Sequence, residues 1–133
     1  MSAGLRDLKV WQEAVALAAD VVRAMRHGSR REVKAVADAA MLSAVALAAQ
    51  IADGYGRYTA PEQRQSYRAA RRELYRLETH LTIARHADLI SGAHLAQLTH
   101  RAQLVGRLLG GFLVYLDRQL TDPASRDSAR APG

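Results

Sequence analysis

The fold is decided by a nearly uncharged stretch at residues 35–52, which reads A-V-A-D-A-A-M-L-S-A-V-A-L-A-A-Q-I-A. Asp38 is its only charged residue, and Ser43 is the only polar residue from Ala39 to Ala49. Alanine and leucine favour the α-helix, so the stretch predicts a helix that is apolar on nearly every side.

A helix that is apolar on nearly every side has more apolar surface than one four-helix bundle can bury. In an isolated four-helix bundle each helix buries one stripe, so this helix requires a second cover, either another subunit or a membrane. The stretch is short for a membrane span and rich in alanine, and amphipathic segments flank it, so we favour another subunit. We expect the subunit contact at Met41, Leu42, Val45, Ala48 and Ala49.

Capping residues mark the two predicted ends of this helix. Ser29 and Glu32 have the S-x-x-E spacing of a capping box, which predicts a helix start there. After the apolar stretch, Gly54 suits a left-handed helix end. Thr59 and Glu62 repeat the capping pattern and predict the start of the next helix.

Amphipathic segments on both sides predict three more helices. A core-facing stripe in the first segment is expected at Leu8, Trp11, Val15, Ala18, Val22 and Met25. A similar stripe in the last segment is expected at Leu95, Leu98, Ala102, Val105, Leu109, Phe112 and Leu116. The helices are predicted at about residues 6–27, 30–53, 60–88 and 92–119. The fold class is therefore all-α, an antiparallel up-down-up-down four-helix bundle over residues 1–120, followed by a disordered tail over residues 121–133.

The composition and charge of the chain exclude several classes of functional site. The chain has 133 residues, the size of one domain, and carries a net charge of +6 with 17 arginines against two lysines. It has no cysteine, which excludes disulfides, thiolate metal sites and cysteine nucleophiles. The histidines lack helical metal spacing and no E-x-x-H pair is present, so we expect no metal, no cofactor and no enzymatic activity. The N-terminus lacks the apolar core of a secretory signal, so we expect a cytoplasmic protein.

The helix expected at residues 60–88 has two unlike faces. One side is apolar, with Tyr67, Ala70, Leu74, Leu77, Leu81 and Ala84. The opposite side, which we name the arginine face, carries Arg64, Arg68, Arg71, Arg72, Tyr75 and Arg76, and Arg57 in the preceding loop extends it. Glu73 can pair with Arg76, but most of the arginine face has no acidic neighbour at helical spacing.

Arginine forks bind phosphates, and an aromatic ring among them can stack on a base, so the arginine face predicts nucleic-acid binding. A solvated helix face or a salt-bridged subunit contact would fit the same pattern. In the last helix, Gly106, Gly110 and Gly111 each lower helix stability relative to alanine, which suggests close approach by another helix.

Three segments carry a family resemblance. They are L-K-V-W-Q-E-A at residues 8–14, Q-I-A-D-G-Y-G-R at residues 50–57 and R-L-E-T-H-L-T-I-A at residues 76–84. Together they resemble the small bacterial four helix bundle protein family, over about residues 5–118. That family includes proteins encoded in intervening sequences of 23S ribosomal RNA genes and accessory variability proteins of diversity-generating retroelements. The stretch V-G-R-L-L-G-G at residues 105–111 is similar to the accessory-protein branch.

The resemblance implies a homopentameric barrel, which would cover the apolar helix. For the retroelement branch it also implies a basic surface that binds RNA and DNA and association with a reverse transcriptase. It implies no catalytic residues. Basic residues of the family are replaced here by Met41 and Leu42, while Arg68 and Arg72 stand where the family has smaller residues, so the binding surface is expected to have moved. We thus expect a nucleic-acid-binding accessory protein; the alternative is a structural or scaffold oligomer that docks an acidic protein partner.

Overall fold

The computed structural model describes residues 4–26 and 31–121. A short 3-10 helix, η1 (Leu5–Asp7), precedes the α-helices α1 (Lys9–Met25), α2 (Arg31–Tyr55), α3 (Ala60–His86) and α4 (Gly92–Thr121). Within these ranges the structure is all-helical and contains no strand, which confirms the predicted fold class of a four-helix bundle.

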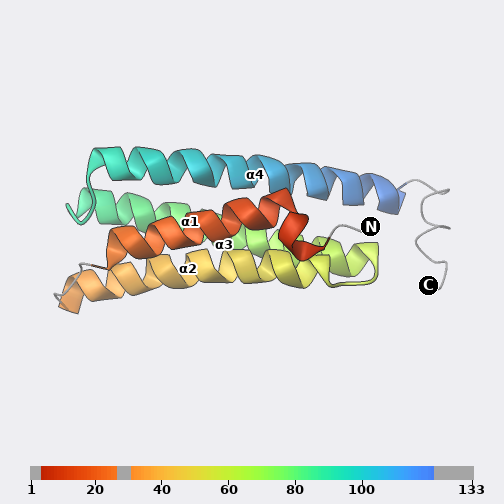
Figure 1. Cartoon of the computed structure of the whole chain (residues 1–133), viewed down its shortest axis with the longest axis horizontal. Coiled ribbons are helices and arrows are strands. Elements are labelled where there is room, and N and C mark those ends of the chain that lie inside the picture. Colours follow the sequence, from red (N-terminus) through yellow and green to blue (C-terminus); the bar gives the residue numbers. More distant parts are fainter. Residues whose placement is uncertain (1–3, 27–30, 122–133) are drawn as a thin grey trace.

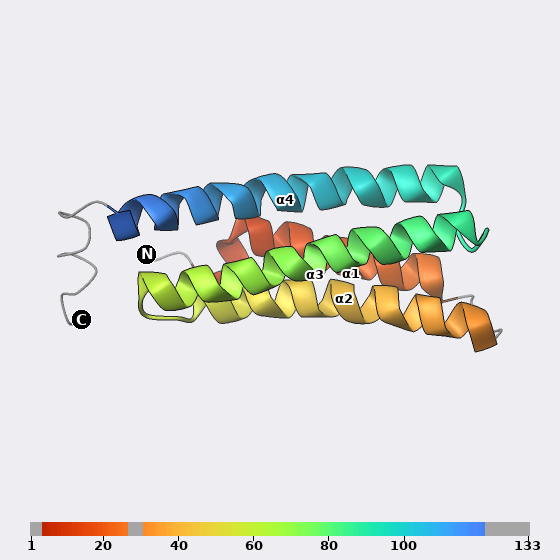
Figure 2. The same cartoon turned by 180° about the vertical axis from the view of Figure 1, so that it is seen from behind.

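The four α-helices lie side by side along the long axis of the molecule, and consecutive helices run in opposite directions (Figure 1). Each helix packs against two neighbours, because α1 contacts both α2 and α4, and α3 contacts the same two helices. Seen from behind, α3 lies beside both α2 and α4 (Figure 2). One side of α3 therefore remains on the outside of the bundle.

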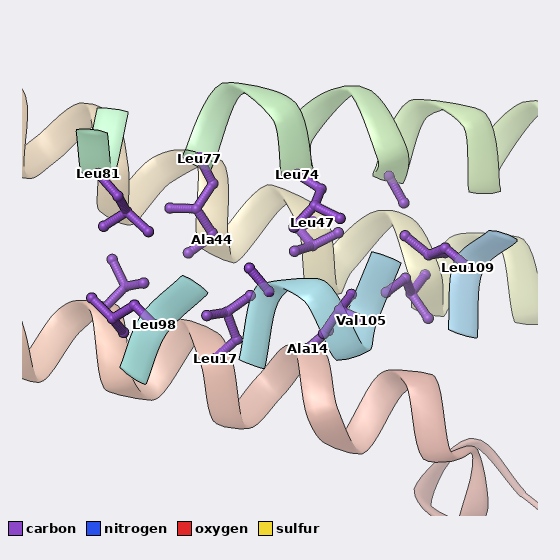
Figure 3. Packing of buried hydrophobic residues seen from close by; sticks show 14 of the residues in the cluster. Ala14, Leu17, Ala44, Leu47, Leu74, Leu77, Leu81, Leu98, Val105 and Leu109 are labelled. Carbon is purple, nitrogen blue, oxygen red and sulfur yellow. The ribbon is translucent and has the colours of Figure 1, made fainter. Parts of the chain in front are cut away.

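Leucine and alanine fill the core. Leu17, Leu47, Leu77 and Leu109 come from the four different helices, and each is 0% exposed. Figure 3 shows these side chains pointing into the space between the helices. Fully buried alanines such as Ala14 stand among them. Small and large side chains thus alternate, which lets the helices approach closely without large aromatic residues.

The core-facing stripe of α1 differs from the prediction. The buried residues of this helix are Val10, Ala14, Leu17, Val21 and Met25. Val15 and Val22, which we expected in the core, are each 40% exposed. Because α1 is apolar on two adjacent stripes, its periodicity cannot decide which stripe faces the core. The predicted stripe was wrong at these two valines.

The predicted left-handed helix end at Gly54 is also wrong. Gly54 lies inside α2, and none of the glycines that the structure describes has a positive φ. A Cβ atom at this position would lie 2.8 Å from Cε1 of Tyr67 on α3. Tyr67 is buried, and its ring stacks on Phe112 of α4 with the ring centroids 5.4 Å apart. Glycine is needed here because an aromatic ring packs against the α2 backbone.

The start of α3 follows the capping signal. The Thr59 hydroxyl accepts a hydrogen bond from the backbone N–H of Glu62 at 3.3 Å, as the spacing predicted. The predicted capping residue Ser29 lies outside the described residues, as does the predicted tail beyond Thr121.

The glycines of α4 have two different environments. A Cβ atom at Gly106 would lie 3.3 Å from Cδ2 of Leu74 on α3, a close approach of the expected kind. No atom of a neighbouring helix lies within 4 Å of such a Cβ at Gly110 or Gly111.

Candidate nucleic-acid interface

The arginine face lies on the outside of α3. Arg68, Arg72, Tyr75 and Arg76 are exposed, whereas Arg64 and Arg71 are half-buried. The predicted apolar residues on the other side of this helix are all buried. Packing of the apolar side against the bundle therefore fixes the direction in which the arginines point.

Three of the candidate arginines are held in ion pairs. Arg76 Nη1 lies 2.7 Å from Glu73 Oε1, which confirms the pair expected from the sequence. Arg64 Nη1 lies 3.2 Å from Asp117 Oδ1 on α4, and Arg57 Nη2 lies 3.1 Å from Asp53 Oδ2 on α2. The partner of Arg64 was missed because it lies on another helix and no local spacing reveals it.

The remaining arginines of the face have no such partner among the described residues. Within the described part of the chain, no acidic side chain forms an ion pair with Arg68, Arg71 or Arg72. At about 1.5 Å per residue, Arg68 and Arg72 are about 6 Å apart along the helix axis, the rise of about two nucleotides of a B-DNA strand. Each guanidinium has five N–H donors available for phosphate oxygens. These three arginines form the uncompensated part of the arginine face.

Tyr75 lies beside this uncompensated part. Its side chain is 60% exposed, and it follows Arg68 by seven residues, nearly two full turns of helix, so both point to the same side. An exposed ring among cations can stack on an unpaired base.

Arg57 has a structural role that the sequence did not reveal. Oδ2 of Asp53 accepts hydrogen bonds from the buried Ser66 hydroxyl at 2.6 Å and from Arg57 Nη2 at 3.1 Å. The hydrogen bond from Ser66 first, and then that from Arg57, hold the pKa of Asp53 below its ordinary value. Gln63 Nε2 also donates to the backbone oxygen of Arg57 at 3.0 Å. Arg57 thus ties the α2–α3 turn together and is less available to an outside anion.

A second exposed surface lies on α2. Leu42 is 70% exposed and Val45 is 54% exposed, although both belong to a helix whose other side is core. Ala49 is also exposed, while Met41 and Ala48 are half-buried. The five residues expected at a subunit contact therefore reach the surface of the single chain.

This surface continues onto α1. Glu13 and Asp20 both pair with Arg101 of α4, which marks the side of α1 that faces α4. Val15 and Val22 each follow one of these acids by two residues, about 200° around the helix, and therefore point away from α4 toward the α2 side. We define the apolar face as Val15, Val22, Met41, Leu42, Val45, Ala48 and Ala49.

Two further features bear on function. By length and composition alone, residues Val33–Tyr55 could cross a membrane, a property that core helices of soluble proteins share. Within the described ranges, no group of three or more histidine, cysteine, aspartate or glutamate residues could hold a metal ion.

Comparison with known proteins gives one family. The sequence profile described as 23S rRNA-intervening sequence protein matches residues 6–111, from η1 into α4. Comparison with curated proteins gives no match.

Proposed function

Because the chain belongs to the 23S rRNA-intervening sequence protein family, we propose that it is a non-enzymatic accessory protein that binds nucleic acid through the arginine face of α3. The observation that carries this proposal is the set of Arg68, Arg71 and Arg72, which have no acidic partner in the part of the chain that the structure describes. Like charges at helical spacing repel one another, and a polyanion would relieve this repulsion.

Phosphate contacts and base stacking would have separate roles. The uncompensated arginines would follow the sugar-phosphate backbone, which gives affinity without sequence preference. The exposed ring of Tyr75 would stack on a base that is not paired, as in single strands. The expected ligand is therefore RNA or DNA with unpaired bases.

The decisive experiment measures binding of fluorescent single-stranded RNA and DNA to the full chain over a range of salt concentrations. Three phosphate contacts predict that the logarithm of the binding constant falls with the logarithm of salt with a slope of about −2 per chain. Absence of binding at low salt, or binding that salt does not weaken, would rule out the arginine face as a nucleic-acid site.

We also propose that copies of the chain cover the apolar face in a cytoplasmic homo-oligomer. Exposure of Leu42 and Val45 supports this assembly, because large apolar side chains on a single-chain surface favour a protein contact. The resemblance noted in the sequence suggests five copies. An oligomer would display several arginine faces to one strand, which raises the overall affinity through multivalency.

We further propose that the chain has a protein partner. The resemblance to retroelement accessory proteins suggests a reverse transcriptase, and a gene for that enzyme beside this one would support it. The alternative, a scaffold that docks an acidic protein, has one observation in its favour: Arg64 already binds a carboxylate on Asp117. Binding to an acidic protein without any binding to RNA or DNA would favour the scaffold.

A further inference from the structure

An open pocket with a volume of about 410 Å³ lies on the outer side of α3, near the C-terminal end of this helix. Thr82, Ile83, His86 and Ala87 line it. Sites for small ligands commonly have volumes of about 300–1,000 Å³. On the basis of the proposed nucleic-acid function, we infer that this pocket is a second base-binding position, which takes an unpaired base of the strand held by the arginine face.

The pocket lies in line with the arginine face. At about 100° per residue, Arg68, Arg72, Thr79, Ile83 and His86 fall within about 60° of one another around the helix axis. All five residues are exposed, so they form one stripe along the outside of α3. The stripe has arginines in its first part and neither arginine nor lysine from Thr79 onward. A strand that extends from the arginines along this stripe reaches the pocket.

The spacing along the helix suits two bases of one strand. Ile83 follows Tyr75 by eight residues, which is about 12 Å at a rise of about 1.5 Å per residue. A stacked strand rises about 3.4 Å per nucleotide, so Tyr75 and the pocket are about three to four nucleotides apart. The whole stripe from Arg68 to His86 measures about 27 Å, the length of about eight such nucleotides.

The lining of the pocket suits an uncharged group with an apolar surface. Ile83 is 46% exposed, although isoleucine is among the residues most often buried. The described lining has no arginine or lysine for a phosphate and no carboxylate for a metal ion. The Thr82 hydroxyl donates to the backbone oxygen of Glu78 at 2.8 Å, so its proton is already used. His86 is exposed and its ring N–H can donate to an acceptor atom at the edge of a base, whose apolar surface packs on Ile83.

The three isoleucines of the chain make the pocket directly observable. Ile51 is 0% exposed and Ile90 is 4% exposed, whereas Ile83 is largely at the surface. NMR of the full chain labelled at the isoleucine methyl groups therefore gives one signal in the pocket and two internal controls. The ligand is a single-stranded oligodeoxyadenylate of about ten nucleotides, long enough for the whole stripe. It is expected to move the Ile83 methyl signal through the ring current of the bound base and to leave the other two unchanged.

A matched ligand separates the base from the phosphates. A strand of equal length whose sugars lack bases keeps every phosphate, so it is expected to shift the amide signals of Arg68 and Arg72. The Ile83 methyl signal is expected to stay in place, because this strand has no ring to enter the pocket. Equal movement of the Ile83 signal with both strands would overturn the inference.

A substitution in the pocket measures its share of the affinity. Ile83→Ser is expected to weaken binding of the adenylate strand by about fivefold, because part of a large apolar side chain is lost from the contact. The salt dependence should not change, since no charge is removed. Val114→Ser is the matched control, because Val114 is 51% exposed and lies on α4 outside the lining. Equal affinities of Ile83→Ser and the control would overturn the inference.

The outcomes distinguish the pocket from the arginine face. If the adenylate strand bound with the expected salt dependence but did not move the Ile83 signal, the pocket would fail as a base-binding position and the proposed function would stand. If the combination of Arg68→Gln, Arg71→Gln and Arg72→Gln kept both the affinity and the Ile83 shift, the pocket would stand and the arginine face would fail. Absence of any binding at low salt would overturn both.

Discussion

The ring of Tyr67 on α3 occupies the space that a side chain at position 54 of α2 would need, since a Cβ atom there would lie 2.8 Å from Cε1 of Tyr67. Tyr67 cannot easily move, because it is buried and stacked on Phe112. The contact joins the end of α2 to α3 and, through Phe112, to α4.

We therefore predict that Gly54→Ala destabilises the protein although alanine is the better helix former. Overpacking costs about 1–3 kcal/mol, which exceeds or cancels the gain of up to about 1 kcal/mol in helix propensity. Gly110→Ala is the control, because an added Cβ there meets no atom within 4 Å, and it is expected to raise the free energy of unfolding. Urea denaturation of both variants checks this. Equal stabilisation by the two substitutions would contradict the packing explanation.

The Asp53 carboxylate gives a prediction about pH. Its pKa is lowered in the folded chain, first by the Ser66 hydrogen bond and then by Arg57, so the unfolded chain takes up the proton at higher pH than the folded chain. The resulting stabilisation is present above the ordinary pKa of 3.8 and is lost as the pH falls through the lowered value.

Ser66→Ala should raise the pKa of Asp53 toward its ordinary value and lower stability more at pH 7 than in acid. An NMR titration of the Asp53 side-chain carbonyl carbon measures the pKa, and denaturation at both pH values measures the stability. Arg57→Gln is expected to raise the pKa less, because the Ser66 bond is the larger cause. A larger effect of Arg57→Gln would reverse this order.

The sequence predicted the number and order of the helices because apolar periodicity and capping residues are local signals. Prediction from the sequence failed where the local structure depends on a residue far away in the chain. The sequence D-G-Y-G resembles a helix end, yet α2 continues through Gly54, where Tyr67 packs against the helix. Tyr67 lies 13 residues further along the chain. Likewise, Asp117 neutralises Arg64 from 53 residues away, so the arginine face has fewer free charges than its pattern suggested.

Neutralising the uncompensated arginines should abolish most nucleic-acid affinity. In the triple variant Arg68→Gln, Arg71→Gln and Arg72→Gln, we expect the logarithm of the binding constant to fall less steeply with the logarithm of salt. The slope should become shallower by about 0.7 for each phosphate that an arginine no longer neutralises. Arg107→Gln with Arg118→Gln removes exposed charge from α4 and should reduce binding much less. Fluorescence anisotropy at several salt concentrations measures both. Similar decreases in affinity per charge in the two chains would show that only net charge matters.

Tyr75 should act through its ring and not through charge. Tyr75→Ala is expected to weaken binding to a single strand by about 1–3 kcal/mol, the usual value of one stacked base, without changing the salt slope. Tyr75→Phe keeps the ring and should bind nearly as well as the parent chain. The same titrations with a duplex of equal length should show little effect of either substitution, since its bases are already stacked. If Tyr75→Phe bound as weakly as Tyr75→Ala, the stacking role would be excluded.

The apolar face should control assembly without contributing to the fold of one chain. Leu42 and Val45 are largely exposed, so Leu42→Glu with Val45→Glu leaves the core intact but places charges in any subunit contact. Light scattering is expected to give a multiple of 14.5 kDa for the parent chain and 14.5 kDa for the variant. Circular dichroism should show the same helix content for both chains. The paired substitutions Lys34→Glu and Tyr58→Glu change two exposed residues outside the apolar face and should leave the mass unchanged. A parent chain that is already monomeric would refute the assembly, and the exposed side chains of Leu42 and Val45 would then require a different protein partner.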